Sequence, residues 1–382
     1  MEELKFVHQV LRSSKLSRTV GKMVLIFEKE FAHAYNVAYG VASTSGTSSI
    51  HVALGALNLN PGDEVITTPI TDMGTIIPIL AQNAVPVFAD IDDTYNISPA
   101  AIESCISERT KAIVTVHTYG NPCDMDGIMA LSRRYNLPVV EDCSQAHMTI
   151  YKGRLLGSIG DMGCFSLHES KHLTTGDGGM TITNRTTYHN IMRLFVDKGF
   201  DRETRAGSPY YFYAPNYRMP ELCAAVGIAQ LKKVSHVVRR RNHLGTMLSN
   251  LLSGTNGVRP APVTPGASHS YWAYPLYLET IDVNVFVNEL KGMAIPAAIH
   301  MSTPLYLSAK ALSTGRVYGS SRCPFSCARP GIEYRRGDCP KAERLTDHLV
   351  TLWLTENWSE DRIRKTAASI KNIVKKLLDN HQ

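Results

Sequence analysis

The chain lacks any long apolar run. No stretch of its 382 residues is long enough to cross a membrane, and residues 1–5 do not begin an apolar segment of signal-peptide length. Internal repeats and low-complexity segments are also absent from the sequence. We therefore expect a cytoplasmic protein that has no membrane partner.

Cysteine is present, but not in the pattern of a metal site or a disulfide scaffold. The eight cysteines are scattered, and the one close pair, Cys323 and Cys327, has no second pair at metal-ligand spacing. Several others lie in apolar segments, where a free thiol packs as a small hydrophobic group. This pattern predicts reduced thiols, no metal site and a reducing compartment.

Charge of one sign is not concentrated in blocks. Lysine and arginine number 40 and the acids 34, a net charge of +6, and the charged and hydrophobic fractions of 19% and 44% are ordinary for a globular enzyme. The basic run at residues 239–241 is typical of a solvated helix face. We expect no nucleic-acid partner.

One lysine, Lys171, lies between an apolar strand-like segment at 163–167 and a glycine-rich turn at 176–179. An unpaired ammonium is costly to desolvate at such a place, and a lysine held there can lose its proton and attack a carbonyl. A surface lysine on a loop is the alternative interpretation.

Two further features precede the lysine. Residues 45–49, Ser-Gly-Thr-Ser-Ser, open a segment with helical periodicity, and free backbone amides at a helix start favour phosphate binding, although a simple N-cap would look the same. Asp142 ends an apolar strand-like segment, where it either caps a helix or lines a ligand cleft. A carboxylate in a cleft can keep a pyridine nitrogen protonated.

A phosphate cradle, a carboxylate and a lysine, in this order, are the set that pyridoxal phosphate requires. With these motifs, the chain resembles the DegT/DnrJ/EryC1/StrS sugar aminotransferases, which have fold type I. The resemblance covers roughly residues 30 to 375. The matching segments are residues 45–47, 61–66, 86–92, 116–120, 141–147, 160–171, 178–180, 216–219, 230–231, 300–306 and 339–343.

The resemblance implies roles for individual residues around the cofactor ring. Lys171 would bind pyridoxal 5'-phosphate as a Schiff base and then move the proton between the cofactor carbon and the substrate carbon. Asp142 would pair with the pyridinium nitrogen, and Gln145 would contact the ring substituents.

The resemblance also implies how the phosphate is held. Gly46, Thr47 and Ser166 would bind it within one chain. Asn216 would reach the phosphate of a neighbouring subunit, so the expected functional unit is a homodimer with shared active sites.

One position departs from the family pattern. The family usually places an aromatic residue on the outer face of the cofactor ring, shortly after the proline that corresponds to Pro69. This chain offers Met73 there, with Asp72 beside it. A thioether can still pack against an aromatic ring, so Met73 is the expected ring contact.

The segments between these motifs alternate between strand-like and helical patterns. We expect an α/β protein of fold type I, with a mostly parallel sheet flanked by helices and a smaller C-terminal α/β domain. The expected division is an N-terminal helical segment at 1–30 that joins the small domain, a cofactor-binding large domain at 31–238 and the small domain at 239–382. The expected strands are residues 64–68, 85–89, 112–116, 139–142, 164–167 and 180–183.

These features predict an aminotransferase that moves an amino group from glutamate or glutamine to a keto-sugar or keto-cyclitol, in amino-sugar or aminocyclitol biosynthesis for an antibiotic or the cell envelope. A related sugar dehydratase or epimerase is one alternative, and dehydratases resembling this family carry histidine at the position of Lys171. A non-catalytic regulatory member is the other.

Some residues near the motifs keep two interpretations. The aromatic stretch at 210–213 fits sugar stacking and dimer packing equally well. His117, His147 and His300 match family positions near the site, but each fits a hydrogen-bonded structural histidine, so none is predicted as a catalytic base.

Overall fold

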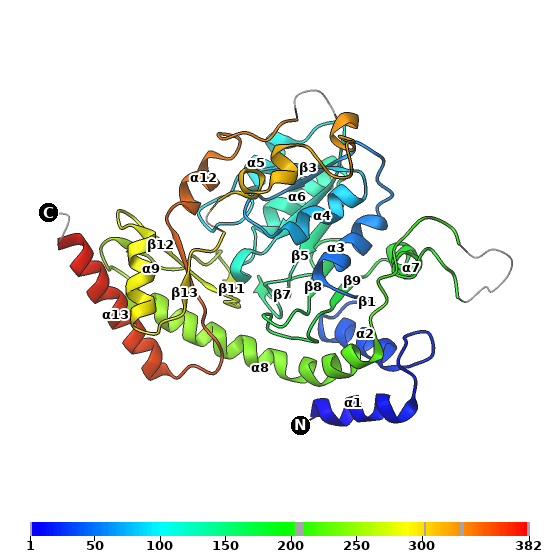
Figure 1. The fold of residues 1–382 in the computed structure, drawn as a ribbon, viewed down its shortest axis with the longest axis horizontal. Helices are drawn as coiled ribbons and strands as arrows, with labels where there is room; N and C mark the ends of the chain where they lie inside the picture. The colour runs from blue at the N-terminus through cyan, green and yellow to red at the C-terminus, as the bar shows by residue number, and fades with distance from the viewer. Residues whose placement is uncertain (1, 203–209, 302, 329–331, 380–382) are drawn as a thin grey trace.

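A seven-stranded sheet forms the centre of the region that the structure describes (Figure 1). The computed structural model describes residues 2–202, 210–301, 303–328 and 332–379. Six strands of this sheet run parallel and β9 runs against them, which confirms the expected mostly parallel sheet. In spatial order the strands are β1 (Tyr39–Ser43), β9 (Gly179–Thr183), β8 (Met162–Ser166), β5 (Val139–Asp142), β4 (Thr110–Val116), β2 (Glu64–Thr67) and β3 (Val85–Phe88).

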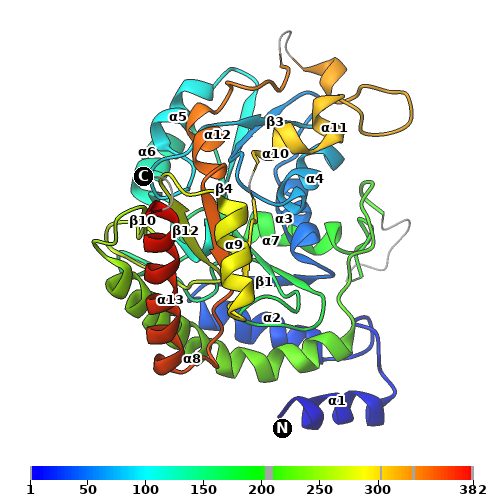
Figure 2. The same ribbon diagram turned by 60° about the vertical axis from the view of Figure 1, so that its left-hand side comes forward.

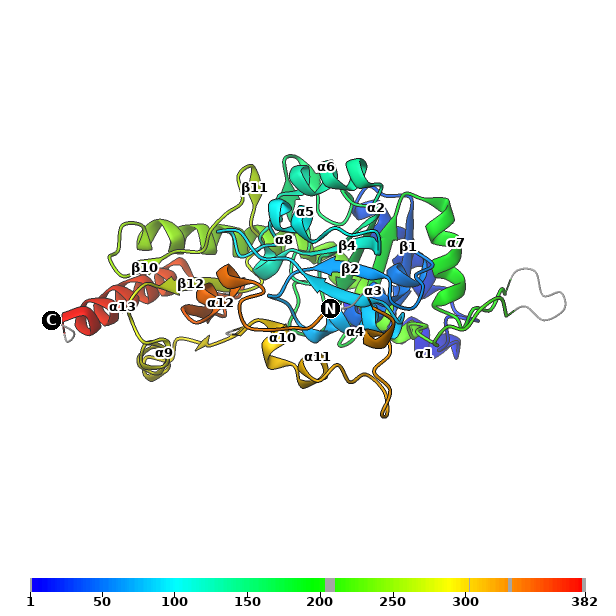
Figure 3. The same cartoon turned by 90° about the horizontal axis from the view of Figure 1, so that it is seen from above.

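Alternate residues of these strands enter two hydrophobic clusters, one on each face of the sheet, because side chains of a strand point to opposite faces in turn. On β5, for example, Val139 packs in the first cluster and Val140 in the second. Figure 3 shows the layers that contain these clusters. The first cluster includes α2 (Met23–Ala34), α5 (Pro99–Cys105) and α6 (Met125–Tyr135), and the second includes α3 (Gly46–Gly55), α4 (Met73–Ala81) and α7 (Thr186–Phe195).

A second, antiparallel sheet lies at the other end of the molecule from α7 (Figures 1 and 3). Its strands in spatial order are β10 (Val258–Arg259), β12 (Tyr274–Leu278), β14 (Leu349–Leu352) and β13 (Ala297–Ala298). The helices α9 (Val283–Gly292) and α13 (Glu360–Asp379) pack side by side on it (Figure 2). One apolar face of α13 is buried there: Ile363, Ala367, Ile370, Val374 and Leu377.

One long helix, α8 (Glu221–Leu252), connects the two parts. Ile228 and Val234 of its first half pack in the first cluster, and Leu244 and Leu252 of its second half pack in the core of the small sheet. The expected division between residues 238 and 239 falls within this uninterrupted helix. The helix α1 (Glu2–Ser13) packs along α8. The division into domains itself stays a prediction.

The remaining elements are short and connect the larger ones. They are η1 (Thr118–Gly120), β6 (Ile150–Tyr151), β7 (Arg154–Leu155), β11 (Ala267–Ser268), α10 (Leu305–Ser308), α11 (Lys310–Ser313), η2 (Phe325–Cys327) and α12 (Pro340–Thr346). Among the helices of the described residues, none has both the length and the apolar character needed to cross a bilayer.

Candidate active site

A cavity of about 400 Å³ opens at the carboxyl ends of the parallel strands, where open α/β sheets bind ligands. The starts of α3 and α4 form part of its wall, and the glycine-rich turn before β9 forms another. Its lining residues are Ser45, Gly46, Thr47, Ile50, Thr71, Asp72, Gly74, Thr75, Val116, Asp142, Ser144, Gln145, Ser166, His168, Ser170, Lys171, Asp177, Gly178, Trp272, His300 and Met301.

The first turn of α3 presents backbone amides to this cavity. Ser45 caps the helix reciprocally: its Oγ accepts from the amide of Ser48 at 3.0 Å, and Ser48 Oγ accepts from the amide of Ser45 at 2.7 Å. The amides of Gly46 and Thr47 precede the first intrahelical hydrogen bonds, so they are suited to bind an anion. A Cβ at Gly46 would lie 2.6 Å from Ser166 Cβ, so a glycine at this position allows the first turn of α3 to lie close to the end of β8.

Asp142 is held at the end of β5 with its carboxylate toward the cavity. Oδ2 accepts from Thr75 Oγ1 at 2.8 Å, and Oδ1 accepts from the amide of Ser144 at 3.0 Å. Thr75 is itself within 2.7 Å of Thr71 Oγ1. This network fixes one orientation of a nearly buried carboxylate, which is the arrangement that a protonated ring nitrogen would need.

Lys171 enters the cavity over the face of Trp272, with Nζ 4.0 Å from the ring centroid. The indole Nε1 donates to the carbonyl of Ser170 at 2.9 Å, which ties the ring to the lysine's own turn. Burial lowers the pKa of Lys171 to about 8, while the carboxylates of Asp142 and Asp72 act in the opposite direction. At pH 7 roughly a tenth of this amine is therefore neutral, far more than of an ordinary lysine, and the neutral form is the one that a nucleophile requires.

Gln145 lies beside Asp142 and is fixed by the chain after β4. Its Oε1 accepts from the amide of Tyr119 at 2.6 Å. Gly120 follows with φ of +93°, and a Cβ there would lie 2.3 Å from Ser270 Oγ, so this tight turn requires glycine.

The predicted histidines have different surroundings. His147 Nε2 lies 2.9 Å from the carbonyl of Ser166, and burial lowers the pKa of His147 to about 4. His300 lines the cavity, and burial also lowers its pKa. Both rings are therefore neutral at neutral pH.

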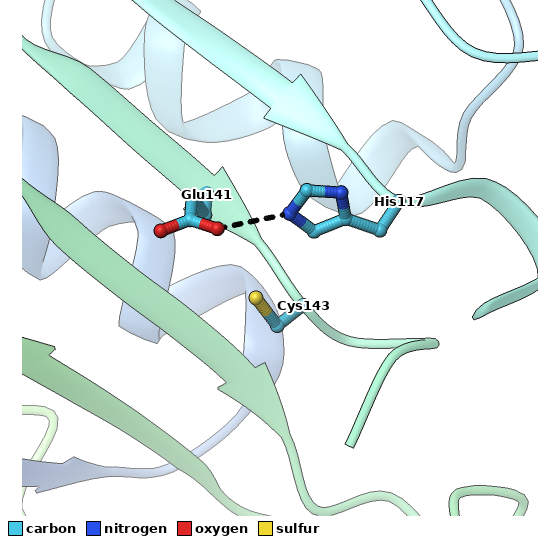
Figure 4. A group of neighbouring side chains, drawn as sticks. All are labelled: His117, Glu141 and Cys143. Atoms are coloured by element: carbon cyan, nitrogen blue, oxygen red, sulfur yellow. Dashed lines mark hydrogen bonds and ion pairs between the residues drawn. The ribbon is translucent and has the colours of Figure 1, made fainter. Parts of the chain in front are cut away.

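His117 belongs to a fully buried group with Glu141 and Cys143, whose ligand-type atoms lie within 4.8 Å of one another (Figure 4). His117 Nδ1 accepts from the amide of Cys123 at 3.1 Å, so Nε2 carries the proton and donates to Glu141 at 3.2 Å. Burial raises the pKa of the Cys143 thiol well above its ordinary value. These hydrogen bonds occupy atoms that a metal would need, and we assign the group to support of β4 and β5.

Six of the eight predicted site residues line the one cavity: Gly46, Thr47, Asp142, Gln145, Ser166 and Lys171. The other two are not among the lining residues of the described chain. Met73 packs against the second hydrophobic cluster, and its neighbours Asp72 and Gly74 line the cavity instead. Asn216 is exposed, and its Oδ1 accepts from the amide of Arg218 at 3.4 Å.

Three residues of the site were not given a role by the sequence motifs. Trp272 supports Lys171, Thr75 supports Asp142, and Asp72 lines the cavity mouth. Trp272 lies about 100 residues after the lysine, at the start of an apolar segment, where no local pattern distinguishes it from a core residue. Thr75 and Asp72 flank Met73 in the segment that departs from the family pattern, which was a usable signal.

This chain is similar to known aminotransferases in both sequence and fold. A family model described as the DegT/DnrJ/EryC1/StrS aminotransferase family matches residues 1–371. The L-glutamine:2-deoxy-scyllo-inosose aminotransferase of Streptoalloteichus tenebrarius is 33% identical over 370 residues, which cover 91% of this chain and 86% of that protein. The GDP-perosamine synthase of Caulobacter vibrioides is 38% identical over 262 residues, 68% of this chain and 70% of that protein. Among solved structures, an aminotransferase from Psychrobacter cryohalolentis aligns with a TM-score of 0.87 and 29% identity over 98% of this chain and 97% of that one.

Proposed function

Because the chain belongs to the DegT/DnrJ/EryC1/StrS aminotransferase family and is a pyridoxal phosphate-dependent aminotransferase, we propose that it transfers an amino group from glutamate or glutamine to a keto-sugar or keto-cyclitol. The product would be an amino sugar or aminocyclitol for an antibiotic or the cell envelope. The observation that supports this most is the joint placement of Lys171, Asp142 and the start of α3 around one cavity.

The residues present fit the cofactor. Gly46 leaves the start of α3 free of a side chain against Ser166, so the phosphate would be held by the amides of Gly46 and Thr47 and by the Ser166 hydroxyl. Asp142 would hold the ring nitrogen protonated, and Gln145 would contact the ring edge. When bound, pyridoxal phosphate supplies an electron-withdrawing ring that stabilises charge left on carbon when a proton departs.

Lys171 then has two tasks in this proposal. Its neutral amine would anchor the cofactor, and once the donor is bound, the released amine would accept the proton from the donor's α-carbon and hold it on one side of the cavity. When the ketone is aminated, the same amine would give a proton to the carbon that receives the nitrogen. Trp272 keeps the amine on one side of the cavity, which directs the proton to one face.

The proposed amino donor is glutamate or glutamine, and the name of one relative favours glutamine. The aminotransferase of Streptoalloteichus tenebrarius is named for glutamine and for a cyclitol ketone. The presence of Lys171 opposes the dehydratase alternative, since dehydratases resembling this family have histidine there. All eight cysteines are free thiols, which fits the proposed cytoplasmic location.

We further propose a homodimer in which Asn216 completes the partner's phosphate site. Asn216 is exposed and lies outside its own chain's cavity lining, so its side chain is available to another subunit. The aromatic residues next to it are also exposed, Tyr211 by 62% and Tyr213 by 97%, as expected for an interface core in the isolated chain.

A spectroscopic screen tests the function. Glutamate or glutamine should bleach the visible band of the purified holoenzyme, and a correct ketone should restore it. Keto-inositols and keto-sugar nucleotides are compared as acceptors in parallel. Failure of both donors to bleach the band would support the non-catalytic alternative and contradict the proposal.

Subunit mixing tests the shared site. Asn216→Ala should bind the cofactor more weakly, and mixing it with Lys171→Ala subunits should restore part of the activity, because one site of a mixed dimer retains both groups. Loss of complementation despite verified subunit exchange, or sedimentation of the active enzyme as a monomer, would contradict the shared site.

A further inference from the structure

Asp72 places a carboxylate in the lining of the active-site cavity, next to Met73, which holds the position where the family usually has an aromatic residue. It caps α4, and its Oδ1 accepts from the amide of Gly74 at 2.7 Å. This hydrogen bond orients the carboxylate but uses only one of its oxygens. Among the described residues, no hydrogen bond to Oδ2 and no ion pair of Asp72 is found.

The lining of this cavity carries more negative than positive charge. Its charged lining residues are three aspartates, Asp72, Asp142 and Asp177, and one lysine, Lys171. Both oxygens of Asp142 already accept hydrogen bonds. Asp72 lines the same cavity as Lys171 and His300, and its negative charge favours the protonated form of both groups.

Charge decides which ligand this position favours. A phosphate or carboxylate group placed next to Asp72 would be repelled, and a hydroxyl would donate a hydrogen bond to the carboxylate. A substrate ammonium would donate the same kind of hydrogen bond and would add the attraction between opposite charges. The donor has no free ammonium to offer, since its amino group is the one that reacts at the cofactor.

We propose that Asp72 selects an acceptor ring that already carries an amino group, by pairing with that ammonium through Oδ2. This inference rests on the proposed function and narrows it: the ketone would be an amino-keto cyclitol or amino-keto sugar, and the product a diamine. A reaction that introduces a first amino group into the ring must then supply the substrate.

Two ring amines can be compared to measure recognition by Asp72 without the transfer reaction. One is a 1,3-diaminocyclitol, and the other is the matched monoamine that has a hydroxyl in place of the second nitrogen. Calorimetry on the pyridoxamine-loaded enzyme measures binding without turnover. The wild type should bind the diamine roughly five- to tenfold more tightly, and this advantage should shrink as salt is added.

The variant is Asp72→Asn, which keeps a helix-capping side chain and removes the charge. It should lose most of the preference for the diamine while binding the monoamine nearly as well. The matched control is Asp282→Asn, which changes the N-cap of α9 and should retain the full preference. Equal binding of both amines by the wild type, or an unchanged preference in Asp72→Asn, would overturn the inference.

Bleaching of the pyridoxal form by the same amines checks the underlying function separately. In that reverse reaction the ring amino group passes to the cofactor, and the ring carbon becomes a ketone with its oxygen from water. If neither amine changes the spectrum, the proposed acceptor class is wrong. The calorimetric comparison of the two amines still decides whether Asp72 recognises a cation.

Discussion

Glu141 and Asp142 are neighbours on β5, but they serve opposite sides of the large sheet. Glu141 is 0% exposed and accepts four hydrogen bonds, three from backbone amides at 157–160 and one from His117 (Figure 4). Asp142 is 4% exposed and lines the cavity. Two equally buried carboxylates thus differ in their access to a ligand. Hydrogen bonds within the chain occupy Glu141, which is not among the lining residues of the cavity, whereas Asp142 is one of them.

Among the residues that line the cavity, Lys171 should have the largest effect on turnover. Lys171→Ala should lower turnover by about 10³-fold or more, because one amine serves as anchor and as proton carrier. The visible band should vanish, while the thermal unfolding midpoint should not fall, since the wild-type amine loses hydration on burial. Lys152→Ala removes an exposed lysine paired with Asp126 and serves as control. Borohydride reduction that links the cofactor to another lysine would refute the assignment.

Asp142→Asn should have the next largest effect, about 10²-fold on turnover, because the ring nitrogen would lose the charge that keeps it protonated. Cofactor retention, measured by dialysis and absorbance, should change much less. Near-normal turnover with bound cofactor would mean that another group holds the ring nitrogen.

Glu141→Gln should produce the opposite result to Asp142→Asn. An amide nitrogen would face backbone N–H donors, so we expect a loss of about 2 kcal/mol in the free energy of unfolding, with turnover per folded molecule nearly retained. Urea denaturation measures the first and steady-state kinetics the second. Glu103→Gln, at a surface pair with Arg134, should cost under about 1 kcal/mol. A Glu141→Gln enzyme of normal stability would remove the distinction between the two carboxylates.

The smallest expected effect is a shift in the pH dependence of cofactor attachment. Cofactor attachment to the apoprotein requires neutral Lys171, so its rate should rise with pH around a midpoint of about 8. Asp72→Asn removes an anion that raises this pKa, so its midpoint should lie lower. Stopped-flow absorbance at several pH values measures both midpoints, and a midpoint that moves upward would contradict the placement of Asp72.

The same lowered pKa has a consequence for stability. Between pH values of about 8, the pKa of folded Lys171, and 10.5, the ordinary pKa of lysine, the unfolded chain holds a proton that folded Lys171 has released. The contribution of this group to the free energy of unfolding therefore rises with pH across that window.

The buried strands were readable from the sequence because parallel strands covered on both faces are continuous apolar runs. The six expected strands are all present, with ends shifted by one or two residues. The strand β1 was not among the expected strands. β1 (Tyr39–Ser43) pairs with β9, about 140 residues away along the chain, so its strand character comes from a partner and not from its own short pattern.

What the sequence determined by itself is the chemistry of the site: a lysine at a strand end, a carboxylate at another, and a helix start with small residues, each carried by a local pattern. The tertiary structure decided which side chains meet. It placed Trp272 under Lys171, packed the half-buried Met73 against the second hydrophobic cluster and brought Asp72 into the cavity lining. Near the start of a helix, adjacent residues point in directions about 100° apart. The packing of the helix on the sheet therefore decides whether Met73 or Asp72 points to the cavity. The local sequence pattern does not contain that information.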